Sequence, residues 1–277
     1  MKVVGDGNVT FILLNGIALP SNVMLSDNVE LQTADTSHLD FMTAISTCSR
    51  PEDVAVVAAF IPRITAQLRI TASTPKELAS VAWNASWEAL LLSAFLQTEI
   101  GFNLQSDTPA NKIGNGSRLR ATNYYMHGLT NSTAHMLTTD ESKWIASHFA
   151  DGRELLENDR FQTAVHCLAS YRWHSMPRIK LAVLWAGIEG IFGASSEIRF
   201  RISLYIARFL HPNSAAERQK IFDSVKKLYD SRSAAVHGAK VKSNIASAVE
   251  DSAEILRYIL LQCVINKAMP QENELVP

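Results

Sequence analysis

An arginine and a histidine stand five positions apart in the stretch "KKLYDSRSAAVHGAK", residues 226 to 240. Arg232 carries a permanent positive charge that can bind an anionic ligand, and His237 can take up or release a proton near neutral pH. Together these residue types suit acid–base chemistry on an anionic substrate. Two plainer roles stay open at this point: a structural salt bridge for Arg232 and a helix-cap contact for His237.

A helix predicted from about residue 215 to 237 must position both side chains. At about 100° per residue, one face of this helix is an apolar stripe, and Arg232 falls near the middle of it. The stripe consists of Ile221, Val225, Leu228, Tyr229, Arg232 and Val236. An unpaired buried charge costs several kcal/mol, so Arg232 needs a carboxylate, backbone carbonyls or an anionic ligand.

Glu189 raises the same question on the preceding apolar helix, where it shares a face with Trp185 and Phe192. It can pair with Arg232 across a helical bundle and position it, or it can satisfy another buried group, and we favour the second role. Asp230 stands four positions after Lys226, a spacing typical of an ordinary surface ion pair.

The charge is unevenly distributed along the 277 residues, although the net charge is only −1. Residues 178 to 242 hold 12 Lys and Arg against 5 Asp and Glu, and the rest of the chain holds 14 against 22. A basic block indicates an anionic partner, nucleic acid first, or simply a solvated helical face.

Cysteine use and apolar runs limit the class of protein. The three cysteines are isolated, and no metal-ligand pattern such as HExxH occurs, so we expect neither disulfides nor a metal or other cofactor. The first residues lack the layout of a signal peptide, and the run "LAVLWAGIEGIFG" is too short to span a bilayer. We therefore expect a cytoplasmic protein without a membrane segment.

The first half of the chain mixes strand and helix signals. Strands are predicted at residues 9–14, 23–26, 29–32, 63–72, 100–106 and 118–126, whereas 37–48 and 51–60 are open between helix and strand. A helix opens with a capping box at Thr74 and Glu77, with Pro75 at its first position. Its predicted buried face consists of Trp83, Trp87, Leu90, Leu91 and Ala94.

After about residue 138 only helix signals remain. Helices are predicted at residues 142–156, 160–173, 178–193, 197–210, 215–237 and 245–268. The sequence therefore predicts an α+β protein, with a mixed α/β domain over residues 1–138, an all-α bundle over 139–270 and a C-terminal tail over 271–277.

Two motifs in the helical half together resemble the Apea-like branch of the HEPN family. The first is "RIKLAVLWAGIEGIFG", with a W-x-x-I-E core from Trp185 to Glu189, and the second is "LYDSRSAAVHG", residues 228 to 238. The intervening "SEIRFRISLYIARFL" looks like the extra helix of that family. The resemblance covers about residues 140 to 270, and the first half is similar to the α/β region that often precedes such domains.

The resemblance implies a HEPN-type bundle that pairs with a second copy and cleaves RNA without a metal. An RNA 2′-OH would attack the adjacent phosphorus, leaving a 2′,3′-cyclic phosphate and a 5′-OH. Arg232 would neutralise the phosphorane, and His237 would move a proton. Supporting roles fall to Ser233, Glu189 and Tyr229. The residues expected to contact the RNA backbone are Arg199, Arg201, Arg208, Lys226 and Lys227.

The same resemblance allows two other functions. Many HEPN domains are non-catalytic modules for dimerisation or RNA binding. A sensor is the third possibility, in which the first 138 residues recognise a ligand and control the bundle; this predicts a sizeable pocket there with convergent polar groups. Family habit also implies a role in phage defence or as a toxin, with an antitoxin or other regulatory partner.

Overall fold

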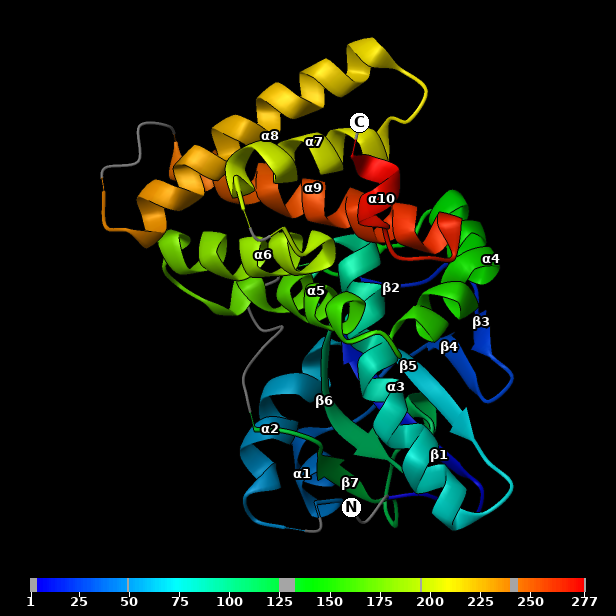
Figure 1. The fold of residues 1–277 in the computed structure, drawn as a ribbon. Coiled ribbons are helices and arrows are strands. Elements are labelled where there is room, and N and C mark those ends of the chain that lie inside the picture. Colours follow the sequence, from blue (N-terminus) through cyan, green and yellow to red (C-terminus); the bar gives the residue numbers. More distant parts are fainter. Residues whose placement is uncertain (1–3, 49, 125–132, 195, 240–243, 277) are drawn as a thin grey trace. The chain divides into compact units, whose positions relative to one another are not determined.

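The chain is an α+β protein that divides into two compact units (Figure 1). The computed structural model describes residues 4–48, 50–124, 133–194, 196–239 and 244–276. The first unit comprises residues 1–92 and 98–150, and the second comprises 93–97 and 151–277. The division therefore lies inside helix α4 (Thr139–Leu155), whereas the sequence indicates a boundary just before that helix.

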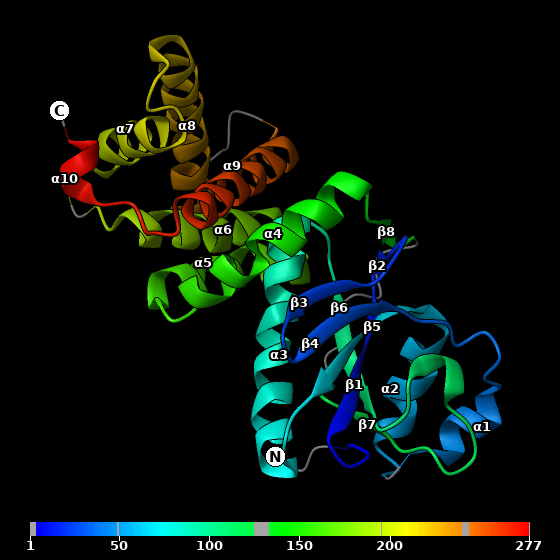
Figure 2. The ribbon, with the colours of Figure 1, turned by 90° about the vertical axis from the view of Figure 1, so that its right-hand side faces the viewer.

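A six-stranded antiparallel sheet forms the centre of the first unit, in the order β3-β4-β5-β1-β6-β7 (Figure 2). Its strands are β1 (Val9–Asn15), β3 (Val23–Ser26), β4 (Val29–Thr33), β5 (Ile64–Thr71), β6 (Gly101–Ser106) and β7 (Leu119–Ala121). A second, parallel pair joins β2 (Ile17–Ala18) to β8 (His135–Met136). The strand predicted at residues 118–126 is thus shorter, and its last two residues lie outside the described part of the chain.

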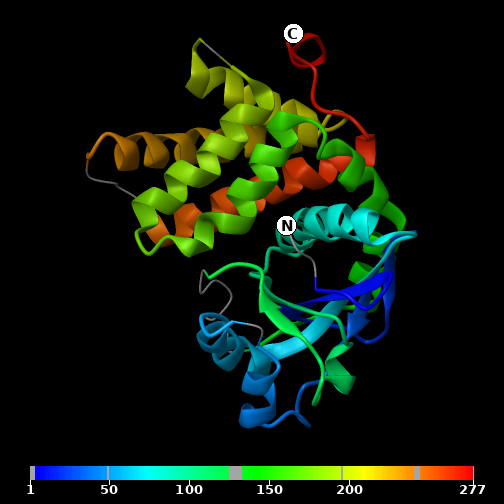
Figure 3. The ribbon, with the colours of Figure 1, turned by 90° about the horizontal axis from the view of Figure 1, so that it is seen from below.

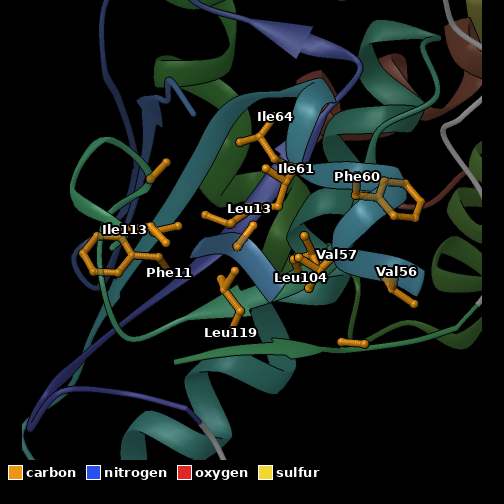
Figure 4. Packing of buried hydrophobic residues seen from close by; sticks show 13 residues of the cluster. Phe11, Leu13, Val56, Val57, Phe60, Ile61, Ile64, Leu104, Ile113 and Leu119 are labelled. Carbon is orange, nitrogen blue, oxygen red and sulfur yellow. The ribbon is translucent and has the colours of Figure 1, made fainter. Parts of the chain in front are cut away.

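Both faces of the sheet are covered, which explains why β1 is apolar at successive positions. Phe11 and Leu13 join a core cluster on the face that α1 (Phe41–Ser46) and α2 (Asp53–Phe60) cover (Figure 4). The other face is covered by α3 (Pro75–Leu96) (Figure 3). The two segments that the sequence left open between helix and strand are therefore α1 and α2.

The face that α3 buries differs from the predicted one. Its buried stripe consists of Leu78, Ala82, Ala85, Ala89 and Leu92. Leu90, Leu91 and Ala94 are buried as expected, but Trp83 is 59% exposed, which makes the prediction for that residue wrong. Small alanines let a helix lie close to a sheet, so they occupy the contact and the larger indole is left outside. The predicted start is confirmed, because the Thr74 hydroxyl accepts from the Glu77 amide at 3.2 Å.

Six helices follow α4 in the described part of the second unit. They are α5 (Asp159–Ser170), α6 (Pro177–Phe192), α7 (Ile198–Leu210), α8 (Ala215–Val236), α9 (Ile245–Asn266) and α10 (Glu272–Leu275). Helix α6 is central, because it contacts α5, α8 and α9 and has seven buried residues between Leu181 and Phe192. Short 3-10 turns occur at Ile61–Arg63, Ala110–Lys112 and Tyr171–Trp173.

Polar residues cap the starts of α8 and α9, the two helices on either side of His237. The Ser214 hydroxyl accepts from the Glu217 amide at the start of α8, and the Asn244 side chain accepts from Ala246 at the start of α9. Helix α8 ends at Val236 with His237 as its C-cap, and Gly238 follows with φ +76°, a left-handed conformation that glycine adopts without strain. Along the described residues, we find no helix with the length and apolar character needed to cross a membrane.

Two glycines of α6 provide a matched test of this packing. A Cβ at Gly187 would lie 3.0 Å from the Cβ of Cys167 and 3.3 Å from the Cα of Ala164, atoms that cannot swing aside. Gly187→Ala should therefore lower the free energy of unfolding by about 1–3 kcal/mol, despite the better helix propensity of alanine. A Cβ at Gly190 would meet nothing within 4 Å, so Gly190→Ala should raise it by up to about 1 kcal/mol. Urea unfolding followed by circular dichroism measures both, and equal effects would contradict this packing.

Candidate functional site

Three contacts hold α6 and α8 side by side. Near the start of α6, Arg178 reaches the carbonyls at the end of α8. Further along, the Trp185 ring meets the Tyr229 ring edge-on, with centroids 5.4 Å apart. Near the end of α6, Glu189 pairs with Arg232. All three partners in α8 lie between residues 229 and 235, so α6 meets the C-terminal part of α8, and both motifs noted in the sequence lie at this one contact.

Arg232 is held by Glu189. Its Nη2 donates to the Glu189 Oε2 at 3.0 Å, and the two side chains are only 21% and 24% exposed. The guanidinium carbon also lies 5.6 Å from the centre of the Tyr229 ring, within range of a cation–π contact. Two roles were considered for Glu189, and the structure shows the pairing with Arg232 across the bundle.

The donors of Arg232 are only partly used. Its Nε and the Glu189 Oε1 are buried with no hydrogen-bond partner among the described residues. Its Nη1 also makes no hydrogen bond within that part of the chain, and it is not a buried atom. The guanidinium therefore keeps a donor that an anion can reach.

Arg232 lies at the edge of the buried face of α8, which corrects the expected stripe. The buried residues of α8 are Val225, Leu228, Ser231 and Ala235. This face is turned by roughly 50° from the predicted one at 3.6 residues per turn. Val236, expected on the stripe, is 48% exposed. The small Ser231 and Ala235 allow close contact with neighbouring helices, so they face inward and the larger Arg232 is moved to the flank.

Burial controls the protonation of Glu189. Removal of the carboxylate from water raises the pKa of Glu189, and the nearby charge of Arg232 lowers it by a smaller amount. The net result is a pKa above the ordinary value of 4.5. Burial therefore disfavours the charged form of Glu189, although this is the form that pairs with Arg232.

His237 is exposed at the C-terminal end of α8. Its amide donates to the Ser233 carbonyl at 3.0 Å, which makes His237 the last residue that the helix holds. Within the described chain, neither the imidazole nor the Ser233 hydroxyl has a hydrogen-bond partner. The ring is therefore free to exchange a proton with solvent or with a substrate.

Arg178 fixes the end of α8 and was not singled out by the sequence motifs. Its Nη1 donates to the carbonyls of Ala234 and Ala235 at 3.2 and 3.0 Å, and its Nη2 donates to that of Ala239 at 2.9 Å. The last carbonyls of a helix have no partner within it, so this guanidinium satisfies them. One sequence signal pointed to it: a cation in the first turn of a helix opposes the helix dipole and so indicates a tertiary partner.

Several of the expected RNA-backbone residues are held by other groups of the protein. Arg199 holds Asp230 with two hydrogen bonds of 2.7 Å, so the expected pair of Lys226 with Asp230 is not formed. The planar guanidinium binds a carboxylate in two-pronged fashion, which the ammonium group cannot do. Lys226 instead lies over the Phe222 ring, with Nζ 5.1 Å from its centre.

Two other arginines of α7 are held by the C-terminal segment. Arg201 donates to Glu272 at 3.2 Å, and the Tyr205 hydroxyl donates to the same carboxylate at 2.8 Å. Arg208 donates to the Leu275 carbonyl at 3.2 Å. The residues expected as a tail thus form α10, which packs on α7. Lys227 remains exposed and lines a groove of about 790 Å³ between α8 and α9.

The first unit holds a smaller hollow, which bears on the sensor hypothesis. About 430 Å³ in volume, it is lined by residues 20–24 and by Thr139, Ser142, Lys143 and Ala146. It is polar on the α4 side, but four of its nine lining residues come from beyond residue 138. Among the described residues, no group of three or more His, Cys, Asp and Glu side chains is placed to hold a metal ion.

Comparisons with protein-family models, with curated proteins and with solved structures find no match to this chain. What the site can do is therefore inferred from its own residues and contacts.

Exchange of Glu189 for glutamine should change the pH dependence of stability. A carboxyl whose pKa is raised in the folded state stabilises that state at low pH, and the contribution is lost as pH rises through the folded pKa. From pH 4.5 upward, the unfolding free energy of the wild type should therefore fall relative to Glu189→Gln, by at most about 1.4 kcal/mol per pH unit. Urea unfolding over a pH series measures the difference. Glu157→Gln, at an exposed position, controls for the loss of one carboxylate, and a rising difference would contradict the assignment.

Removal of the Arg178 side chain should loosen the end of α8. Arg178→Ala leaves the carbonyls of Ala234 and Ala235 without their donor and should lower the free energy of unfolding by about 1–3 kcal/mol. Hydrogen exchange at the amides of Val236 and His237 should speed up more than exchange in the middle of the helix. Lys180→Ala, two positions along α6, is the matched control. Unchanged exchange at His237 would show that Arg178 does not hold this helix end.

Proposed function

We propose that this protein is a HEPN-type endoribonuclease that cleaves RNA without a metal and acts as a dimer. One observation carries the proposal: Arg232 is held by Glu189 with a donor left over, and the exposed His237 follows five positions later with a free imidazole. A positioned cation and an exchangeable proton are the two groups that phosphodiester cleavage by an internal hydroxyl requires. The resemblance of both motifs to the Apea-like HEPN branch supports the same reaction.

The proposed reaction is an attack by the RNA 2′-OH on the adjacent phosphorus. A bond forms between the 2′ oxygen and phosphorus, the bond from phosphorus to the 5′ oxygen breaks, and the products are a 2′,3′-cyclic phosphate and a 5′-OH. His237 transfers a proton, from the attacking hydroxyl or to the leaving oxygen. A second copy supplies a second histidine, so that the two proton transfers can be divided between the copies.

Arg232 stabilises the extra negative charge on the phosphorane. Glu189 accepts a hydrogen bond from Nη2, which fixes the plane of the guanidinium and leaves Nη1 to donate to a phosphate oxygen. The partial burial of the pair strengthens this interaction relative to one in bulk water. Ser233, one position after Arg232, offers a hydroxyl without a partner in the described chain and serves as a second donor to the phosphate.

A non-catalytic module is the second candidate, and the ion pair itself favours it. The ion pair with Glu189 is enough to explain the position of Arg232, because a half-buried cation needs a counter-charge. In that case the domain binds RNA or a second copy without cleaving, and His237 is only the last residue of α8. A place in phage defence or as a toxin belongs to the first candidate and rests on the family resemblance.

Incubation with mixed RNA in excess EDTA separates the two candidates. The wild type should release fragments with cyclic-phosphate and 5′-OH ends, and RNA methylated at every 2′ oxygen should stay intact because it lacks the nucleophile. His237→Ala should reduce the rate by about 10²–10⁴-fold, as loss of a general acid–base group does. Arg232→Ala should reduce it by about 10²–10³-fold, as loss of a charge-stabilising donor does.

His148→Ala, in the first unit, controls for loss of a histidine and should retain full activity. Arg232→Lys keeps the charge but cannot hold Glu189 and phosphate in one plane, so it should recover only part of the rate. If the wild type, Arg232→Ala and His237→Ala are all folded and all leave RNA intact, the enzyme hypothesis fails and the non-catalytic module replaces it.

A further inference from the structure

Two hollows follow the seam between α7 and α8, and Phe200 borders both of them. The first, about 510 Å³, lies at the start of α7 and is lined by residues 196–200, Lys226 and Tyr229. The second, about 350 Å³, continues along the seam past Leu204 and Phe222. Together they form a groove, here called the α7–α8 groove, with Phe200 between its two halves.

Aromatic rings form the middle of this groove. Phe200 is 53% exposed, and its ring meets Phe222 edge-on with centroids 5.7 Å apart. The contact holds the Phe200 ring against Phe222, while about half of the residue stays exposed to solvent. A phenylalanine held in this way offers a flat apolar platform at the surface.

Cations flank the platform on both sides. Lys226 borders the first hollow, and Arg208 and Arg218 border the second. Neither Lys226 nor Arg218 forms a salt bridge within the described residues, and Arg218 uses its Nη1 to donate to the carbonyls of His211 and Pro212. Glu197 is the acidic side chain that lines the first hollow, and the lining of the second contains no carboxylate. The groove therefore combines an apolar floor with a surplus of positive charge.

The groove ends at the candidate site. Tyr229 lines the first hollow, and the same ring lies 5.6 Å from the guanidinium carbon of Arg232. Tyr229 is therefore shared between the contact with Arg232 and the first hollow, which Lys226 and Phe200 also line. Rings and cations in alternation match the alternation of bases and phosphates in a nucleic-acid strand.

We propose that the α7–α8 groove binds single-stranded RNA, with an unpaired base stacked on Phe200 and phosphates at Lys226 and Arg218. The identity of the strand as the substrate rests on the proposed ribonuclease function. The preference for a single strand follows from the aromatic floor of the groove. Bases in a duplex are stacked on each other and have no free face for Phe200. Phe200 then selects RNA that presents an unpaired base a few nucleotides from the bond that is cut.

Binding to a labelled single-stranded RNA with 2′-O-methyl groups tests the groove apart from cleavage, because this RNA lacks the nucleophile. Fluorescence anisotropy with the full chain should show tighter binding to the single strand than to the same sequence as a duplex. Phe200→Ala should weaken single-strand binding on the order of 10-fold. Ile265→Ala, an equally exposed apolar residue of α9, should leave it unchanged.

Salt dependence gives a second readout that a change of folding would not produce. Lys226→Gln should reduce the slope of log affinity against log salt by about 0.7, the value for one phosphate contact on a single strand. Equal effects of Phe200→Ala and Ile265→Ala, equal binding of duplex, or no binding of any RNA would overturn the inference. If the groove binds as expected while no variant or wild type cleaves, the groove stands and the ribonuclease proposal fails.

Discussion

The half-buried ion pair of Glu189 and Arg232 is the constraint on which the rest of the helical unit depends. A charge taken out of water needs a counter-charge, and here each partner comes from a different helix, 43 positions apart in sequence. The pair therefore fixes the register of α8 against α6. Once that register is set, the Trp185 and Tyr229 rings meet and Arg178 reaches the end of α8.

The end of α8 shows how a fold can leave a reactive group free. Helix ends carry unpaired carbonyls, and a side chain close in sequence often satisfies them. In this protein Arg178 does so from another helix, and the neighbouring His237 keeps its imidazole unpaired within the described chain. The backbone of this helix end is thus tied by hydrogen bonds, whereas the imidazole has none in the described chain, an arrangement suited to proton transfer at a fixed place.

Positive charge in this unit serves two different purposes. Arg199, Arg201 and Arg208 are held by groups of the protein itself, partly through the short helix α10, and so tie segments together. Lys226 borders a groove with an aromatic floor, and its ammonium group has neither a hydrogen-bond partner nor a carboxylate partner in the described residues. A count of basic residues treats these two groups alike, whereas their partners separate structural cations from cations that can meet a ligand.

The sequence alone determined the α+β class, the helices of the second half and the place of Arg232 and His237 at the end of one helix. These features follow from local rules of periodicity and capping, which act over a few residues. Only the tertiary structure decided that Trp83 is exposed, that the buried face of α8 includes Ser231 and Ala235, and that Asp230 pairs with Arg199. Periodicity shows which residues share a face, but the neighbour that buries a face comes from far along the chain, and close packing favours its small residues over its large ones.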